Sequence, residues 1–130
     1  MNFVNFRISG QNIDLEGMSK ALNIPPTYVC KKGNTNYDKI TKQTFTYTED
    51  VWTYDIEIKN EDETEKRMEE FVDLFYKNKE HVRKISKIHD VTLWITIYPD
   101  SHQYHLRFSK NVLNKISELG VDFGVTCMQL

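Results

Sequence analysis

The alternation of apolar and polar residues along residues 91–98 constrains the fold more than any other feature of this sequence. Four aliphatic residues take turns with threonine and aromatic residues, in the order Val91, Thr92, Leu93, Trp94, Ile95, Thr96, Ile97 and Tyr98. Successive side chains on a strand point to opposite faces, so the pattern predicts a strand with one aliphatic and one threonine/aromatic face. The aliphatic face belongs in a core. The other face is too aromatic for an ordinary wet surface, and we interpret it as a place where the protein meets a partner.

Size and charge exclude several classes of protein. The chain has 130 residues, of which 39% are hydrophobic and 28% charged, so we expect residues 1–130 to form a single globular domain. A net charge of −2 argues against nucleic-acid binding, which leaves a basic footprint. No apolar run approaches the roughly 20 residues of a membrane helix, and the first residues lack the pattern of a signal peptide. We therefore expect a cytoplasmic protein that does not enter a membrane.

The two cysteines predict neither a disulfide framework nor a zinc site. Cys30 and Cys127 lie far apart in the sequence and neither belongs to a CxxC pair. Two reduced thiols are the ordinary state of such residues in a cytosolic protein.

The periodicity of the apolar residues predicts the remaining elements. Alternation predicts strands at residues 3–9, 28–31, 51–59, 91–98, 102–108 and 121–127, a weak strand at 45–47 and a loop at 32–38. Helical spacing predicts a helix capped by Asp14, a long helix after Asn60 that breaks near Asn78, and a last helix capped by Ser109. Residues 99–101 (Pro-Asp-Ser) read as the turn of a hairpin between strands 91–98 and 102–108.

The order of these elements, roughly β-α-β-β-α-β-β-α-β, predicts an α+β fold. Because each strand has one aliphatic face, helices should pack on one face of a mostly antiparallel sheet and form a two-layer sandwich. Residues 3–31 and 104–128 both read as strand, helix and strand, which suggests a weak internal duplication.

Four short segments, spread over nearly the whole chain, carry a family resemblance. They are residues 6–10 (Phe-Arg-Ile-Ser-Gly), residues 22–27 (Leu-Asn-Ile-Pro-Pro-Thr), Lys32-Gly33 followed by Trp52, and Phe108-Ser109 followed by residues 119–121 (Leu-Gly-Val). Through them the chain resembles the bacterial family catalogued as domain of unknown function 4279. Asn23 stands where that family usually has glycine, and the chain lacks the acidic Asp-Ile-Tyr ending of many such sequences.

The resemblance implies a small bacterial α+β domain for which no catalytic residues are established. Similar small bacterial proteins often sit beside toxins or other conflict systems. By analogy alone, the resemblance suggests an immunity protein or another inhibitor that binds a toxin or defence component.

No motif in the sequence predicts catalysis, a cofactor or a metal site. His102 and His105 lie three residues apart on a predicted strand and so face opposite sides, which prevents them from holding one metal together. His89 and Asp90 could form a proton-transfer pair, but a histidine at a helix C-terminus has a simpler electrostatic explanation. There is no G-x-S-x-G elbow and no glycine-rich phosphate loop. An enzyme built on His89 and Asp90, or on His105, is the third hypothesis.

The outward sheet face is the remaining candidate site. If the strands are neighbours, it carries Arg7, Thr53, Asp55, Glu57, Thr92, Trp94, Thr96, Tyr98, His105, Arg107 and Asp122. From these we select Trp94, Tyr98, Arg7, Arg107 and His105 as binding residues, since Trp, Tyr and Arg are favoured interface anchors.

Three interpretations of this face stay open. The first is a non-enzymatic module that binds another protein or a second copy of itself. The second is a small-molecule or nucleotide binder that uses Arg7, Arg107 and His105. The third is that residues 32–50 fold over the face and cover Trp94. Binding of single-stranded nucleic acid by stacking on these aromatics is disfavoured by the net charge.

Overall fold

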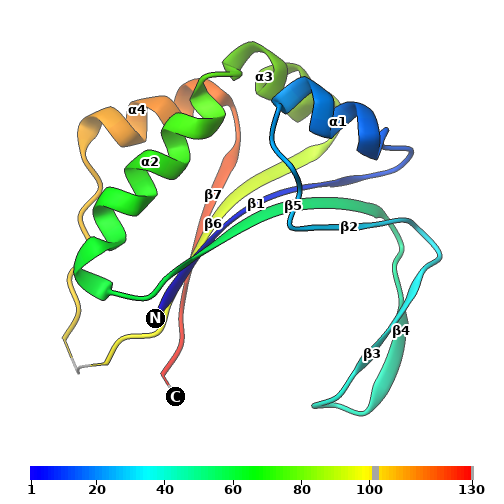
Figure 1. Cartoon of the computed structure of the whole chain (residues 1–130), viewed down its shortest axis with the longest axis horizontal. Coiled ribbons are helices and arrows are strands. Elements are labelled where there is room, and N and C mark those ends of the chain that lie inside the picture. The colour runs from blue at the N-terminus through cyan, green and yellow to red at the C-terminus, as the bar shows by residue number, and fades with distance from the viewer. Residues whose placement is uncertain (101–102, 130) are drawn as a thin grey trace.

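The structure, a computed structural model, describes residues 1–100 and 103–129 and confirms the α+β class. Its strands are β1 (Asn2–Gly10), β2 (Tyr28–Cys30), β3 (Thr35–Asp38), β4 (Gln43–Thr46), β5 (Asp50–Ile58), β6 (Asp90–Ile97) and β7 (Asp122–Cys127). Its helices are α1 (Leu15–Leu22), α2 (Thr64–Tyr76), α3 (Lys79–Ile88) and α4 (Lys110–Leu119), and a short 3₁₀ turn (Glu61–Glu63) precedes α2. The helices lie together on one face of the sheet, and the opposite face is concave (Figure 1).

Within the described residues, the main sheet has five strands in the order β2-β5-β1-β6-β7. The central strand β1 pairs antiparallel with β5, from Asn2 opposite Ile58 to Gly10 opposite Asp50, and antiparallel with β6 on its other side. The pairing of β6 with β7 is parallel. The sheet is therefore mostly antiparallel, as the sequence predicts, with one parallel pair at an edge.

The core lies between the sheet and the helices. Val4, Phe6 and Ile8 of β1 are at most 1% exposed, which confirms the face that alternation assigns to them. Phe6 stacks on Phe75 of α2 with ring centroids 3.8 Å apart. Trp52 of β5 is fully buried, and its Nε1 donates to Ser19 Oγ of α1 at 3.0 Å. Helices α1 and α2, which are far apart in sequence, thus share one aromatic cluster with the sheet.

The helix ends follow the capping residues of the sequence. Asp14 accepts a hydrogen bond from the backbone N–H of Gly17 at 3.0 Å, and Ser109 accepts one from Val112 at 3.2 Å. Asn23 ends α1 in the left-handed conformation, with φ 54°. The next amide, of Ile24, bonds back to Ser19, as in a Schellman motif. Glycine adopts the left-handed conformation most easily, and asparagine tolerates it better than most other residues. Asn23 can therefore end the helix where the family usually has glycine.

The prediction of a strand at 102–108 is wrong for the residues described. Residues 103–109 form no strand; they run along α2 to the start of α4 (Figure 1). Tyr104 Oη bonds Thr64 Oγ1 at 3.3 Å, and the amide of Arg107 donates to Glu65 Oε1 at 2.6 Å. The physical reason is that β6 already has β1 on one edge and β7 on the other, so no edge is left for a hairpin partner. Ser101 and His102, part of the predicted turn and strand, lie outside the described residues.

This correction also bears on the sequence repeat. The first copy begins with strand β1, whereas residues 104–108 are irregular, so the two segments do not fold alike at their starts.

The expected loop at 32–38 is also partly wrong, because Thr35–Asp38 forms β3 and pairs with β4. The resulting hairpin projects from the β2–β5 end of the sheet, on the side away from the helices (Figure 1). Two backbone hydrogen bonds of 2.9 Å hold its base. The amide of Gly33 donates to the carbonyl of Tyr47, and the amide of Tyr47 donates to the carbonyl of Asn34. Asp50 also accepts from the amides of Lys32 at 2.8 Å and Ile13 at 3.0 Å. The amide of Lys32 is the main cause, and that of Ile13 the next, of a lowered pKa for the Asp50 carboxyl.

Candidate functional site

The register of the five strands determines which side chains share the outward face. Residues directly opposite one another on neighbouring strands lie on the same face. One row across the sheet runs through Tyr28, Thr53, Arg7, Thr92 and Asp122, and the next through Asp55, Asn5, Trp94 and Gly124. Arg7 and Trp94 are therefore diagonal neighbours at the centre of this face. The sequence predicts that they share the face, and the strand order brings them together.

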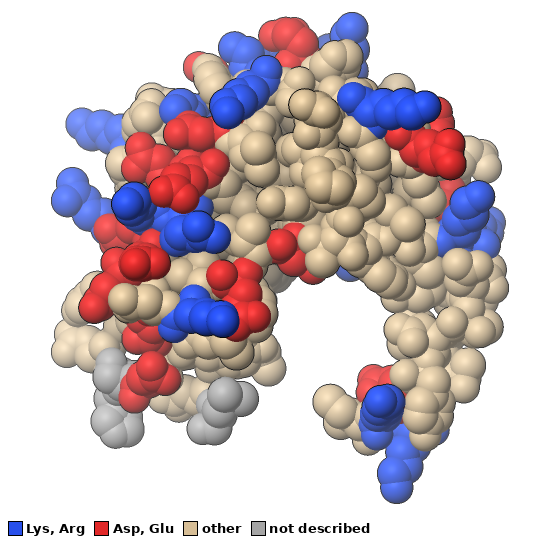
Figure 2. Space-filling model, viewed as in Figure 1, with Lys and Arg blue, Asp and Glu red and all other residues tan. Residues whose placement is uncertain are grey.

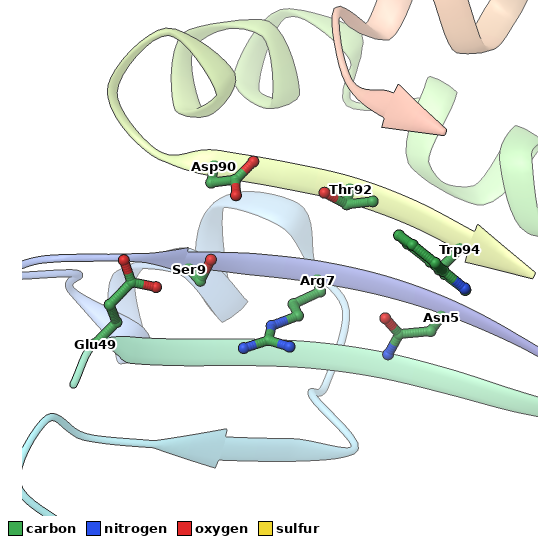
Figure 3. Close-up of a pocket in the computed structure, with 7 residues that line it drawn as sticks. All are labelled: Asn5, Arg7, Ser9, Glu49, Asp90, Thr92 and Trp94. Carbon is green, nitrogen blue, oxygen red and sulfur yellow. The ribbon is translucent and has the colours of Figure 1, made fainter. Parts of the chain in front are cut away.

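A cavity of about 490 Å³ lies at the middle of the outward face, next to the base of the hairpin (Figure 3). It is lined by Asn5, Arg7, Ser9, Glu49, Asp90, Thr92 and Trp94. Figure 2 shows that the surface is hollowed more widely between the hairpin and the main body of the protein. The outward face is thus the floor of an open groove, and the hairpin is one of its walls.

Arg7 is the single cation among the outward positions of the five strands, all of which are described. No described residue forms an ion pair or a hydrogen bond with its side chain, which is exposed. The same positions hold the carboxylates of Asp55, Glu57, Asp90 and Asp122, and Glu49 adds another from the cavity wall. The groove is therefore acidic, with one unneutralised arginine at its centre.

Trp94 is 40% exposed and is held in place by β7. Its ring occupies the space where a side chain would stand on Gly124, since a Cβ built there would lie 2.8 Å from Cδ2 and closer still to Cε3 and Cζ3. Its Nε1 donates to Thr126 Oγ1 at 2.7 Å. Residues 32–50 do not bury Trp94, so the interpretation in which they cover it is wrong; a neighbouring strand supports the ring and leaves one side open.

Tyr98 follows β6 and lies beyond Trp94 on the same face. Its ring meets that of Phe3 edge-to-face, with centroids 5.9 Å apart, and its amide donates to Asn2 Oδ1 at 3.0 Å. Tyr98 is half-buried, so it contributes a fixed aromatic wall rather than a free side chain.

A second aromatic series runs from the sheet onto the hairpin. The hydroxyl of Tyr28 on β2 bonds that of Tyr47 at 2.6 Å, and the ring of Tyr47 lies 5.3 Å from that of Phe45 on β4. Hydrogen bonds with Cys30 and Tyr47 raise the pKa of Tyr28, so its hydroxyl is neutral at physiological pH. Phe45 is 44% exposed. The apolar part of the groove therefore includes rings on β2 and on the hairpin, in addition to Trp94 on β6.

The placement of His105 and Arg107 on this face is wrong. Both belong to the irregular crossing segment next to α2, and Arg107 lines a separate hollow with Glu65, Lys66 and Glu69. His105 Nε2 lies 3.0 Å from Gln103 Nε2. The sequence places them with Trp94 only because their segment also alternates between apolar and polar residues. In the structure this segment forms no strand.

The structure does not pair the side chains of His89 and Asp90, on which the enzyme hypothesis partly rests. The ring of His89 packs against Gly10, while Asp90 is an outward residue of β6, and no hydrogen bond joins the two side chains. The described residues also contain no group of three or more histidine, cysteine, aspartate or glutamate side chains placed to hold a metal ion. Among the same residues, no helix is long and apolar enough to cross a membrane.

Sequence reasoning missed Asn5, Ser9, Asp90 and Glu49 as lining residues. Asn5 and Ser9 could have been found, because they lie two positions on either side of Arg7 along β1, and Asp90 because it lies two positions before Thr92 on β6. Glu49 carries no such signal, since its position depends on how the chain leaves the hairpin for β5.

Comparison with known proteins gives one match. The family model described as Domain of unknown function (DUF4279) matches residues 1–129. No curated protein and no solved structure matches the chain.

Proposed function

The chain belongs to the DUF4279 family, and from this premise we propose that it is a non-enzymatic module that binds a basic segment of another protein in the groove on its outward sheet face. The observation that carries this proposal is the combination of an exposed, fixed Trp94 with a ring of carboxylates around the floor of the groove.

The charges of the groove favour a basic occupant. Asp55, Glu57, Asp90 and Asp122 are all exposed, and Glu49 stands at the cavity wall. Opposite charges across an interface raise the rate of association and exclude partners of the wrong sign. Lysine or arginine side chains of a partner would meet these carboxylates, and the guanidinium of Arg7 would donate hydrogen bonds to a backbone carbonyl or an acidic side chain of the same segment.

Trp94 has the properties of an interface anchor. Tryptophan is enriched among the residues that dominate binding energy. The contact with Gly124 and the hydrogen bond to Thr126 already hold its ring in the free protein, so binding costs little of the entropy that a mobile side chain would lose. The open side of the ring is left for the partner, and the apolar stem of a lysine or arginine can lie against it.

The finer role in this proposal is that of an immunity protein or another inhibitor in the cytoplasm of a bacterium. Its support is the family resemblance and the analogy with small bacterial proteins found beside toxin genes. Co-expression with the product of a neighbouring toxin gene tests this role: survival that depends on Trp94 supports it, and survival that is indifferent to Trp94 opposes it.

The alternative, a small-molecule or nucleotide binder, uses the same cavity. Its support is the cavity of about 490 Å³ with Arg7 and Trp94 in its lining. The carboxylates of Glu49 and Asp90 in the same lining repel phosphate, so a nucleotide is the less favoured occupant. Thermal unfolding separates the two proposals, because a ligand that binds only the folded state raises the melting temperature. A clear rise with a nucleotide would favour the alternative.

A displayed peptide library tests the leading proposal without knowledge of the natural partner. We expect the wild-type protein to enrich lysine- and arginine-rich peptides, and Trp94→Ala to weaken their binding at least about tenfold. Tyr98→Ala should weaken it less, because that ring is half-buried. Tyr37→Ala is the matched control, since Tyr37 is 55% exposed but lies on the opposite face of the hairpin from Phe45.

A charge reversal gives an independent reading. Asp90→Lys should reduce the preference for basic peptides, whereas Glu80→Lys, on exposed α3, should leave it unchanged. Equal enrichment by the folded Trp94→Ala protein, or no enrichment of basic peptides by the wild type, would refute the groove as the binding site.

A further inference from the structure

The strand β7 has an open edge along its whole length. It pairs with β6 from Asp122 to Cys127, and no other described strand lies beside it. The amide of Met128 bonds the carbonyl of Ile97. Because hydrogen bonding alternates along a parallel strand, the backbone groups of Gly124 and Thr126 also face β6. Those of Phe123, Val125 and Cys127 therefore point to the open edge.

This edge lacks the devices with which proteins usually protect an edge strand. Charged side chains, proline, bulges and short strands are the common protections. The segment from Phe123 to Cys127 has no charge and no proline, and Val125 is 50% exposed.

The other edge of the sheet is protected by contrast. β2 has only three residues, and the half of β5 that it leaves open carries Asp55 and Glu57. The hydroxyl of Thr27 also accepts a hydrogen bond from the backbone amide of Asp55 at 2.9 Å, so that amide is not free to pair with another strand. One edge of this sheet is thus closed to strand addition and the other is not.

We propose that β7 pairs antiparallel with β7 of a second copy of this chain, about a two-fold axis at Val125, and so joins two sheets into one. This register pairs all three residues whose backbone groups point outward: Val125 faces Val125 of the partner copy, and Phe123 faces Cys127. About six main-chain hydrogen bonds then close the edge. A closed two-fold contact of this kind is the commonest form of homodimer.

The side chains suit a second copy in this register. Asp122, the one charged residue of β7, falls opposite the uncharged Met128, so the two carboxylates lie at opposite ends of the contact. The two Val125 side chains meet at the centre on the helical side, where a pair of β-branched residues stabilises a cross-strand contact. Gly124, beneath Trp94, faces Thr126 on the groove side, so each Trp94 lies close to the joint and the two grooves form one continuous surface.

Sedimentation equilibrium over a range of protein concentration tests the dimer. The wild type should move from the monomer mass of 15.4 kDa towards twice that mass as concentration rises. Val125→Lys places two like charges at the axis and should stay monomeric at every concentration. Val29→Lys is the matched control, because Val29 is 44% exposed on the protected edge strand β2, and it should dimerise as the wild type does.

A second variant keeps the test independent of charge. Val125→Pro removes an amide that faces the open edge and does not bond β6, so it should block dimerisation while circular dichroism shows the native fold. Val125→Cys in a Cys127→Ser background should form a disulfide-linked dimer under oxidation, as the register requires. A wild type that remains monomeric throughout, or folded Val125→Lys and Val125→Pro proteins that dimerise normally, would overturn the proposal. Because a single copy carries every residue that lines the groove, a failed dimer leaves the peptide-binding result unaffected.

Discussion

Replacing Gly124 with alanine should destabilise the protein through Trp94, although alanine is the better residue for a strand. The added methyl group would occupy the space of the indole ring, closer to Cε3 and Cζ3 than real Cβ atoms approach. The backbone of Gly124 has no positive φ, so alanine causes no backbone strain. The ring must therefore swing away from β7, and its Nε1 loses the 2.7 Å bond to Thr126.

The expected loss of stability is about 1–2 kcal/mol. Overpacking costs about 1–3 kcal/mol, and the low end applies because Trp94 is 40% exposed and can move into solvent. The lost hydrogen bond adds about 0.5–1.5 kcal/mol. The smaller entropy cost of ordering alanine returns about 0.5–1 kcal/mol.

Urea unfolding followed by far-UV circular dichroism measures this loss, and a double-mutant cycle identifies its cause. In a Trp94→Ala background the clash is absent, so Gly124→Ala should be neutral or stabilising by up to about 1 kcal/mol. The Trp94 indole N–H resonance should shift in the single variant, while that of buried Trp52 stays in place. An unchanged urea midpoint, or the same destabilisation in both backgrounds, would refute the reasoning.

Three further predictions concern other parts of the fold. Asn23→Ala should lower the free energy of unfolding by about 1 kcal/mol and Asn23→Gly should raise it slightly, because residue 23 has a left-handed backbone. Urea unfolding checks this: the midpoint should be highest with glycine at position 23, lower with asparagine and lowest with alanine. Phe75→Ala should cost about 3–5 kcal/mol, because the ring is 1% exposed and stacks on Phe6, and a loss below 1 kcal/mol in chemical denaturation would contradict this packing. The pKa of Asp50 is lower in the folded than in the unfolded chain, so its contribution to stability is present above its ordinary pKa and disappears as the pH falls through the lowered value. Asp50→Asn should therefore be less stable at neutral pH and lose less stability on acidification, and parallel pH profiles for the two proteins would oppose this.

The candidate site could be predicted only in part from the sequence. Arg7 and Trp94 lie on the same face because β1 and β6 both alternate and both bury their aliphatic residues, which is a local property. His105 and Arg107 belong to a segment that alternates equally well and yet forms no strand. Alternation says which side chains share a face if a strand exists; it does not say whether a neighbouring edge is free to pair with it.

The hairpin shows a second limit of local reasoning. The glycine, asparagine and aspartate residues between Lys32 and Asp38 are poor strand formers, and the sequence predicts a loop there. Thr35–Asp38 nevertheless pairs with β4, and the base of the hairpin is held by Tyr47, Gly33 and Asp50. Backbone hydrogen bonds to distant residues overcome the weak preference of the side chains.

By itself, the sequence determined the α+β class, the inward and outward faces of β1, β5 and β6, and the capped starts of α1 and α4. These features follow from periodicity and from side chains that bond the nearest amides, so they need no knowledge of the rest of the chain. Only the tertiary structure decided that β7 lies parallel beside β6, with Gly124 under Trp94 and its far edge open. That arrangement depends on strand order, which joins residues about 30 positions apart, and it determines both how Trp94 is held and where a second copy can add.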